Sequence, residues 1–287
     1  MDTKSSYAAV LALSACFASA VWAEDYRLEK QLPLAAGGSL SVRSEAGGIQ
    51  VRGAADVTEA AVTVTSDRSD FAEKYTVRVE AARPDRIEVV VERKSRGLSS
   101  WFGDGWSSKT RIEVVVPKFA AVEADSSGGG IEISDVDGAV RAESSGGSVS
   151  VMNLGGAATL SSSGGSISAE SVAGDVDASS SGGGVKILEA GGVVVAESSG
   201  GSVSVGFGAG NGRGGRLESS GGGVKARVDP TVGLEIDASS SGGSVDCDLP
   251  VTVRGKVGRD NLHGKLNGGG ALLKLSSSGG GVTLAER

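Results

Sequence analysis

Apolar and polar residues alternate along most of the chain after residue 120, in short runs that glycine clusters separate. Small or β-branched apolar residues occupy every second position after these clusters, as in IEI (131–133) and SVSV (148–151 and 202–205). Alternation with a period of two is typical of a β-strand that buries one face. The pattern therefore predicts a succession of short strands with turns at the glycines.

The clusters share the tetrapeptide SSGG, which begins at positions 126, 144, 162, 180, 198, 219, 240 and 277. The first five copies follow one another at an interval of 18 residues, and a second glycine divides each period into 10 and 8 residues (Gly138, Gly156, Gly174 and Gly192). Two corners per coil follow. Two apolar columns are expected to point inward, one made of Ile131, Val149, Ile167, Val185 and Val203, the other of Ile133, Val151, Ala169, Ile187 and Val205.

A single coil of this kind cannot fold alone. It buries about five small apolar side chains, each contributing roughly 1.5–3 kcal/mol, against about 1–2 kcal/mol of backbone ordering for every residue. Stacked coils fold because neighbouring strands share hydrogen bonds and the columns form a continuous core. Glycine is expected at the corners for positive φ and close backbone approach, and the inward serines Ser144, Ser162, Ser180 and Ser198 are expected to form hydrogen bonds along the stack.

These features predict an all-β fold, a parallel β-solenoid with about 18 residues per coil. A left-handed hexapeptide helix would place an apolar marker every six residues, and parallel crossovers prefer the right hand, so a right-handed β-helix is expected. LSVRSEAGGIQV (40–51) aligns with VRAESSGGSVSV (140–151), so the solenoid begins before residue 50. Strands between 54 and 120 are longer and less regular, which predicts wider, irregular coils over 24–120 and SSGG-repeat coils over 121–287 of a single elongated domain.

Residues 1–23 read as a signal peptide. Lys4 precedes a mostly apolar stretch, and VWA (21–23) places small residues suitably for cleavage before Glu24. Export to the periplasm or cell surface follows. LSAC (13–16) resembles a lipobox, so the alternative is a lipid anchor on Cys16. No later stretch has the length and apolarity of a transmembrane segment.

Composition supports repetition over disorder. The chain has 47 glycines in 287 residues, far above the usual share of about 7%, but 39% of its residues are hydrophobic. The formal net charge of −7 provides no basic field for nucleic acid. With one cysteine left after signal cleavage, no intramolecular disulfide can form.

Three segments together carry a family resemblance: VVVPKFAAVEADSSGGGIEISDV (114–136), the repeated SSGGSVSV, and LHGKLNGGGALLKLSSSGGGVTL (262–284). They resemble the bacterial family of exported β-strand-repeat proteins catalogued as “putative adhesins” of unknown function. The resemblance covers nearly all of the mature chain. It implies a cell-envelope β-helix with no assigned enzyme activity.

Enzymes of the parallel β-helix class act on polysaccharides through paired outward carboxylates. Two such pairs are expected on adjacent coils, Asp125 with Glu143 and Glu197 with Glu218. No aromatic sugar platform lies in register with either pair, which favours a solvated face over a catalytic one. The sequence assigns no catalytic residue, metal ligand or cofactor.

The single histidine and the remaining cysteine have ordinary interpretations. His263, in RGKVGRDNLHGK (254–265), is expected in a loop, with a basic patch for anionic polymers as the alternative. Cys247 follows Val245 as Val151 follows Val149, which predicts a buried small hydrophobe.

GLSSWFGDGWSSKT (97–110) differs from the rest of this aromatic-poor chain. Trp101, Phe102 and Trp106 are a candidate contact surface there, the alternative being a cap over the N-terminal coils.

The sequence thus predicts a non-enzymatic, exported structural or binding module of the cell envelope, adhesin-like in character. Its partner would be an envelope polymer or protein, with no nucleic acid and no cofactor. The alternative is a polysaccharide-active β-helix enzyme, a hydrolase or lyase.

Overall fold

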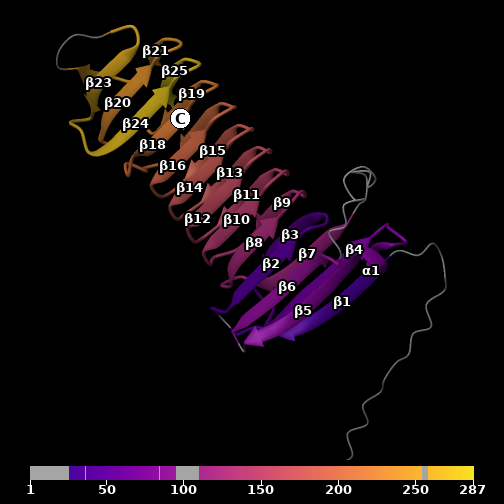
Figure 1. Ribbon diagram of the computed structural model, residues 1–287. Coiled ribbons are helices and arrows are strands. Elements are labelled where there is room, and N and C mark those ends of the chain that lie inside the picture. Colours follow the sequence, from indigo (N-terminus) through magenta and orange to yellow (C-terminus); the bar gives the residue numbers. More distant parts are fainter. Residues whose placement is uncertain (1–25, 36, 84, 95–109, 254–257) are drawn as a thin grey trace, which may run out of the picture.

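The computed structural model describes residues 26–35, 37–83, 85–94, 110–253 and 258–287. They form an elongated stack of β-strands arranged as two long sheets that face each other (Figure 1). The only helix of these residues is α1 (Phe71–Lys74). The all-β, solenoid-like architecture predicted from the repeats is confirmed.

Within the described residues, sheet A has twelve strands in the spatial order β1 (Tyr26–Pro33), β4 (Glu59–Ser66), β7 (Arg111–Pro117), β3 (Gly48–Ala54), β9 (Ile131–Ser134), β11 (Val149–Leu154), β13 (Ile167–Val172), β15 (Val185–Ala190), β17 (Val203–Phe207), β19 (Val224–Val228), β25 (Val282–Glu286) and β21 (Val245–Cys247). Sheet B has thirteen in the same part of the chain, in the order β22 (Val251–Val253), β23 (Asn261–Leu266), β20 (Leu234–Ser240), β24 (Ala271–Ser277), β18 (Gly215–Ser219), β16 (Val194–Ser198), β14 (Val176–Ser180), β12 (Ala158–Ser162), β10 (Val140–Ser144), β8 (Ala121–Ser126), β2 (Ser39–Ser44), β6 (Arg86–Arg93) and β5 (Tyr75–Arg83).

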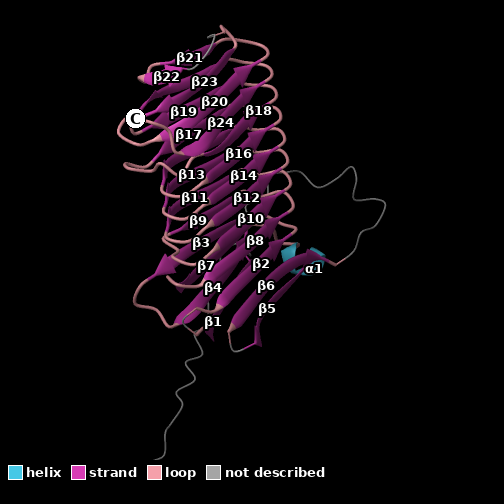
Figure 2. Cartoon of the chain, turned by 90° about the vertical axis from the view of Figure 1, so that its left-hand side faces the viewer, coloured by secondary structure: helices cyan, strands magenta, loops and turns pink. Residues whose placement is uncertain are grey.

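The repeat coils stack in parallel with the expected register. On sheet A, Val149 lies opposite Ile131 and Ile167, 18 residues away on each side. On sheet B, Val140 lies opposite Val122 and Ala158 in the same way. Both predicted inward columns are buried, at 2% exposure or less. The core is therefore a set of apolar ridges between the two sheets, whose strands are stacked along the long axis in Figure 2.

A ladder of serine hydroxyls joins successive coils at the SSGG corner. Ser144 Oγ donates to the carbonyl of Gly129 in the preceding coil (3.0 Å) and accepts from Gly147 N of its own coil (2.9 Å). The same two contacts recur at Ser162, Ser180, Ser198, Ser219, Ser240 and Ser277. Each buried hydroxyl thus pairs with a part-buried backbone donor and a part-buried backbone acceptor, which confirms the structural role expected for these serines.

Removing one hydroxyl of this ladder is expected to destabilise the protein. Ser162→Ala takes away the partner of both Gly147 O and Gly165 N, at a cost of about 1–3 kcal/mol in the free energy of unfolding. Chemical denaturation would measure it. Ser163→Ala, at the exposed neighbouring position, is the control and should change stability by less than about 0.5 kcal/mol. Equal effects would contradict the ladder.

The corner glycines serve close backbone approach. A Cβ built on Gly147 would lie 2.3 Å from the carbonyl oxygen of Gly129, and one on Gly165 would lie 2.3 Å from that of Gly147. Neither has a positive φ, so the expectation of left-handed glycines is wrong at these corners. Positive φ falls instead on a non-glycine column, Asp135, Asn153, Ser171 and Glu189, with φ between 55° and 59°. The short polar side chains of aspartate and asparagine tolerate that conformation best.

Two adjacent glycines test this explanation. Gly129→Ala would place a methyl group 1.9 Å from the carbonyl oxygen of Gly47, whereas a Cβ on Gly128 meets nothing within 4 Å. We expect Gly129→Ala to lower the unfolding free energy by about 2 kcal/mol or more, because the coils must move apart. Gly128→Ala should be neutral or slightly stabilising. Thermal unfolding of both variants would show the difference, and similar midpoints would contradict close packing at this corner.

The coils do not follow chain order at the two ends of the stack. Strands β2 and β3 lie between the β6–β7 pair and the β8–β9 pair. Strands β24 and β25, the last of the chain, lie between the β18–β19 pair and the β20–β21 pair. Each end of the solenoid therefore contains a coil inserted between segments that are distant in the sequence. The repeats alone predict coils stacked in chain order, so this insertion differs from the expectation.

The irregular N-terminal coils are only partly as predicted. Strands β6 and β7 run parallel to the neighbouring coil, but β1 and β4 pair antiparallel with each other, as do β4 with β7 and β5 with β6. Strand β23 pairs antiparallel with β20 and β22 at the other end. Antiparallel pairs need only a short connection, so they can close a stack where no further coil follows.

Candidate binding groove on sheet B

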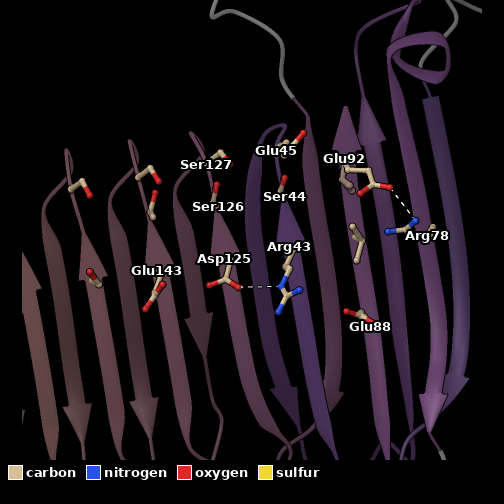
Figure 3. Close-up of a pocket in the computed structure, with 16 residues that line it drawn as sticks. Arg43, Ser44, Glu45, Arg78, Glu88, Glu92, Asp125, Ser126, Ser127 and Glu143 are labelled. Atoms are coloured by element: carbon tan, nitrogen blue, oxygen red, sulfur yellow. Dashed lines mark ion pairs between the residues drawn. The ribbon is translucent and has the colours of Figure 1, made fainter. Parts of the chain in front are cut away.

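The outer face of sheet B is hollowed where its N-terminal strands meet the first repeat coils (Figure 3). The groove has a volume of about 590 Å³ and crosses β5, β6, β2, β8, β10 and β12. Its lining is mostly polar and consists of Arg43, Ser44, Glu45, Arg78, Glu88, Val90, Val91, Glu92, Asp125, Ser126, Ser127, Glu143, Ser144, Ser145, Ser161 and Ser163. The groove is open and suits an extended polar ligand better than a small enclosed one.

Ion pairs between strands organise the groove. Arg43 Nε lies 3.4 Å from Asp125 Oδ2, which joins β2 to β8. Arg78 Nη1 lies 3.0 Å from Glu92 Oε1, which joins β5 to β6. Both pairs are drawn in Figure 3. The groove thus presents fixed guanidinium donors beside carboxylate acceptors, a pattern that can hydrogen-bond hydroxyl or amide groups of a ligand.

A row of hydroxyls follows one side of the groove. Ser127, Ser145 and Ser163 are the exposed second serines of three successive SSGG copies. Because they belong to adjacent coils, they repeat at the spacing of parallel strands, about 4.8 Å. The buried first serines are already occupied by the ladder, so the exposed ones are the hydroxyls available to a partner.

Both predicted carboxylate pairs lie on adjacent strands. Glu143 is opposite Asp125, and Glu218 is opposite Glu197. Each pair has an arginine beside it, since Arg43 and Arg141 contact the first and Arg216 contacts the second. Arginine therefore offsets the repulsion between the two carboxylates of each pair.

The electrostatics of Glu218 are unlike those of a general acid. Its pKa is lowered, chiefly by the hydrogen bond that Arg216 Nη2 donates to Oε2 at 2.6 Å. A general acid in glycoside cleavage needs a raised pKa, which burial away from positive charge provides. This carboxylate is held ionised and gives no support to an acid role.

His263 lies on a strand, so its expected place in a loop is wrong. It belongs to β23, its Nδ1 is 3.1 Å from Asp237 Oδ1 on β20, and its side chain is 69% exposed. A second open cavity of about 440 Å³ includes it, with Glu235, Thr252, Gly264, Lys265 and Gly268. Strand β23 pairs antiparallel with β20 and β22, outside the 18-residue repeat, so the period that marks the other strands does not mark this one.

Cys247 has the predicted inward parity but is only half-buried. It lies opposite Leu284 on β21, the edge strand of sheet A, so no further coil covers it. Burial raises the pKa of its thiol, which disfavours the reactive thiolate.

Several predicted residues lie outside the residues that the structure describes. They are Trp101, Phe102 and Trp106 of the aromatic segment, Cys16, and the whole leader. Among the described residues, no three His, Cys, Asp or Glu side chains are grouped so as to hold a metal ion. The same part of the chain has no helix long and apolar enough to cross a membrane.

Comparison with known proteins finds likeness in structure only. No family model matches the chain, and no curated protein matches it. A “putative adhesin” from Bacteroides fragilis NCTC 9343 has a TM-score of 0.50 at 12% identity, with 93% of this chain and 100% of that chain covered. A “putative lipid binding protein” from Parabacteroides distasonis ATCC 8503 has a TM-score of 0.44 at 14% identity, with coverage of 91% and 97%. A “putative cell adhesion protein” from Clostridium sporogenes ATCC 15579 has 0.32 at 12%, with coverage of 91% and 100%.

The first of these structures confirms the resemblance to adhesin-like repeat proteins at the level of fold. At such low identity the likeness describes the fold and not the ligand.

Proposed function

We propose that the mature chain is a non-enzymatic, exported module of the cell envelope that binds an envelope polymer or protein in an adhesin-like way. The observation that carries the proposal is the open polar groove of sheet B, in which arginines pair with the carboxylates. Every strand beneath it except the edge strand β5 is hydrogen-bonded to a neighbour on both sides, which makes the surface rigid. It offers donors and acceptors in fixed positions, which supports recognition without turnover.

The test is a pull-down of envelope fractions and purified glycans with residues 24–287. Arg43→Ala with Arg78→Ala should weaken retention, because both guanidinium groups line the groove. The matched control is Arg213→Ala with Arg216→Ala, two ion-paired surface arginines away from the groove. Loss of binding in both double variants, or in neither, would contradict a groove-centred contact.

We further propose that residues 1–23 are removed on export, that 24–287 form a single elongated domain, and that its coils wind in the right-handed sense. Intact-mass analysis of the protein recovered from the producing cells should give Glu24 as the first residue. A lipid-modified Cys16 at the N-terminus would instead show a membrane-anchored lipoprotein.

The aromatic segment is proposed as an additional contact surface. If Trp101, Phe102 and Trp106 contact a partner, Trp101→Ala with Trp106→Ala should weaken binding and leave the unfolding midpoint nearly unchanged. A midpoint lowered by several degrees, as expected when buried tryptophans are truncated, would assign these rings to a cap instead.

A further inference from the structure

The outer face of sheet A carries a set of cations that the sequence does not group. Lys186 on β15 and Lys225 on β19 both lie opposite Ser204 on the intervening strand β17. They are therefore two strands apart, about 9.6 Å along the stack. Arg227 stands two residues after Lys225, about 6.6 Å along the same strand and on the same face. We call these three residues the sheet A cation strip; strands β15, β17 and β19 are consecutive neighbours in sheet A.

These cations differ from those of the opposite face in their pairing. On sheet B, five cations each form an ion pair with a carboxylate within 4.0 Å: Arg43, Arg86, Arg141, Arg216 and Lys274. Among the described residues, no carboxylate pairs with Lys186, Lys225 or Arg227, whose strand neighbours are serine, threonine, glycine and alanine. A surface that leaves its cations unpaired, in a chain of net charge −7, is a candidate anion site.

The surroundings of the strip restrict the ligand. Hydroxyls of Ser204 and Thr283 lie beside Lys225 and can donate to ligand oxygens. A carboxylate flanks the strip on each side. Glu170 of β13 lies opposite Leu188 of β15, and Asp246 of β21 lies opposite Thr283 of β25. A densely charged polyanion would bring its charges against these acids, whereas one with widely spaced charges would not.

We propose that the sheet A cation strip binds a linear, sparsely charged acidic polysaccharide lying along the stack. The distance between Lys186 and Lys225 is comparable to the length of a disaccharide, so one carboxylate on every second sugar meets successive cations, and the intervening sugar meets Ser204. This inference rests on the proposed binding role and names one ligand class for it. It assigns the contact to a face that the groove of sheet B does not share.

Hyaluronan is a suitable probe because it carries one carboxylate per disaccharide, with neutral dextran for comparison. The mature protein should bind immobilised hyaluronan and not dextran, and about 0.5 M salt should abolish the binding. Lys186→Gln, Lys225→Gln and Arg227→Gln together should weaken it about tenfold or more. The control triple, Arg213→Gln, Arg216→Gln and Lys274→Gln, changes the net charge equally, away from both the strip and the groove, and should stay within about twofold.

Three results would overturn the proposal: no binding to hyaluronan, an equal loss in both triple variants, or tighter binding to vesicles of anionic phospholipid than to hyaluronan. Circular dichroism would check that both triples remain folded. Because the groove variants are tested on envelope fractions, failure of the strip leaves a positive groove result intact, and the two proposals fail separately.

Discussion

Replacing Val185 with aspartate is expected to prevent the chain from folding. Val185 is 1% exposed and lies in the inward column between Ile167 and Val203. An aspartate there would bury a carboxyl group among aliphatic side chains with no partner, which costs several kcal/mol whether it is ionised or neutral. The loss, about 4 kcal/mol or more, is comparable to the stability of a typical domain.

Lys186→Asp is the matched control for this substitution. Lys186 is exposed on the outer face of the same strand, so the change should alter the free energy of unfolding by less than about 0.5 kcal/mol. Circular dichroism and the yield of soluble protein would distinguish the two variants. If Val185→Asp folded as well as Lys186→Asp, the assignment of inward and outward positions would be wrong throughout the stack.

Deleting residues 271–287 is expected to release the C-terminal end of the solenoid. These residues form β24 and β25, which pair with strands on both sides. Leu273, Leu275, Val282 and Leu284 are fully buried, and each contributes roughly 1.5–3 kcal/mol. Without this coil, β20 and β21 lose their parallel partners, so residues 229–266 should become susceptible to protease while 121–228 remain protected.

Hydrogen exchange followed by mass spectrometry would measure this separation directly. The control deletion removes residues 229–287, which leaves β18 and β19 as a terminal coil with no gap in the stack. That shorter chain should be protected throughout 121–228. Persistent protection of 234–247 in the 271–287 deletion would mean that β20 and β21 had closed onto β18 and β19, contrary to a required inserted coil.

The repeat region could be predicted because its information is local. Val149, Ile167 and Val185 are inward because they alternate with polar residues, and they stack because the interval of 18 recurs. The serine ladder followed from the same parity. Even the early coil at 40–51 was recognised by its alignment with a later repeat, and β2 and β3 indeed belong to the stack.

The ends could not be predicted in the same way, because periodicity describes a coil and not its place along the axis. Strands β24 and β25 lie between β18–β19 and β20–β21 because they hydrogen-bond to both pairs. These pairings join segments distant in the sequence, so no local pattern indicates them. Arg43 and Asp125 meet in the groove only because β2 lies beside β8. Similarly, Lys186, Lys225 and Arg227 share a face through register, and no spacing in the sequence marks them as a set.

The central claim, that this solenoid binds an envelope polymer without chemically changing it, has one direct test. Residues 24–287 are incubated with each polymer that they retain, at a molar excess of polymer, and the chain length and new reducing or unsaturated ends of the polymer are followed over time. We predict saturable binding with an unchanged length distribution. Progressive shortening that is abolished by Glu143→Gln or Glu197→Gln would contradict the account and identify a polysaccharide-cleaving enzyme.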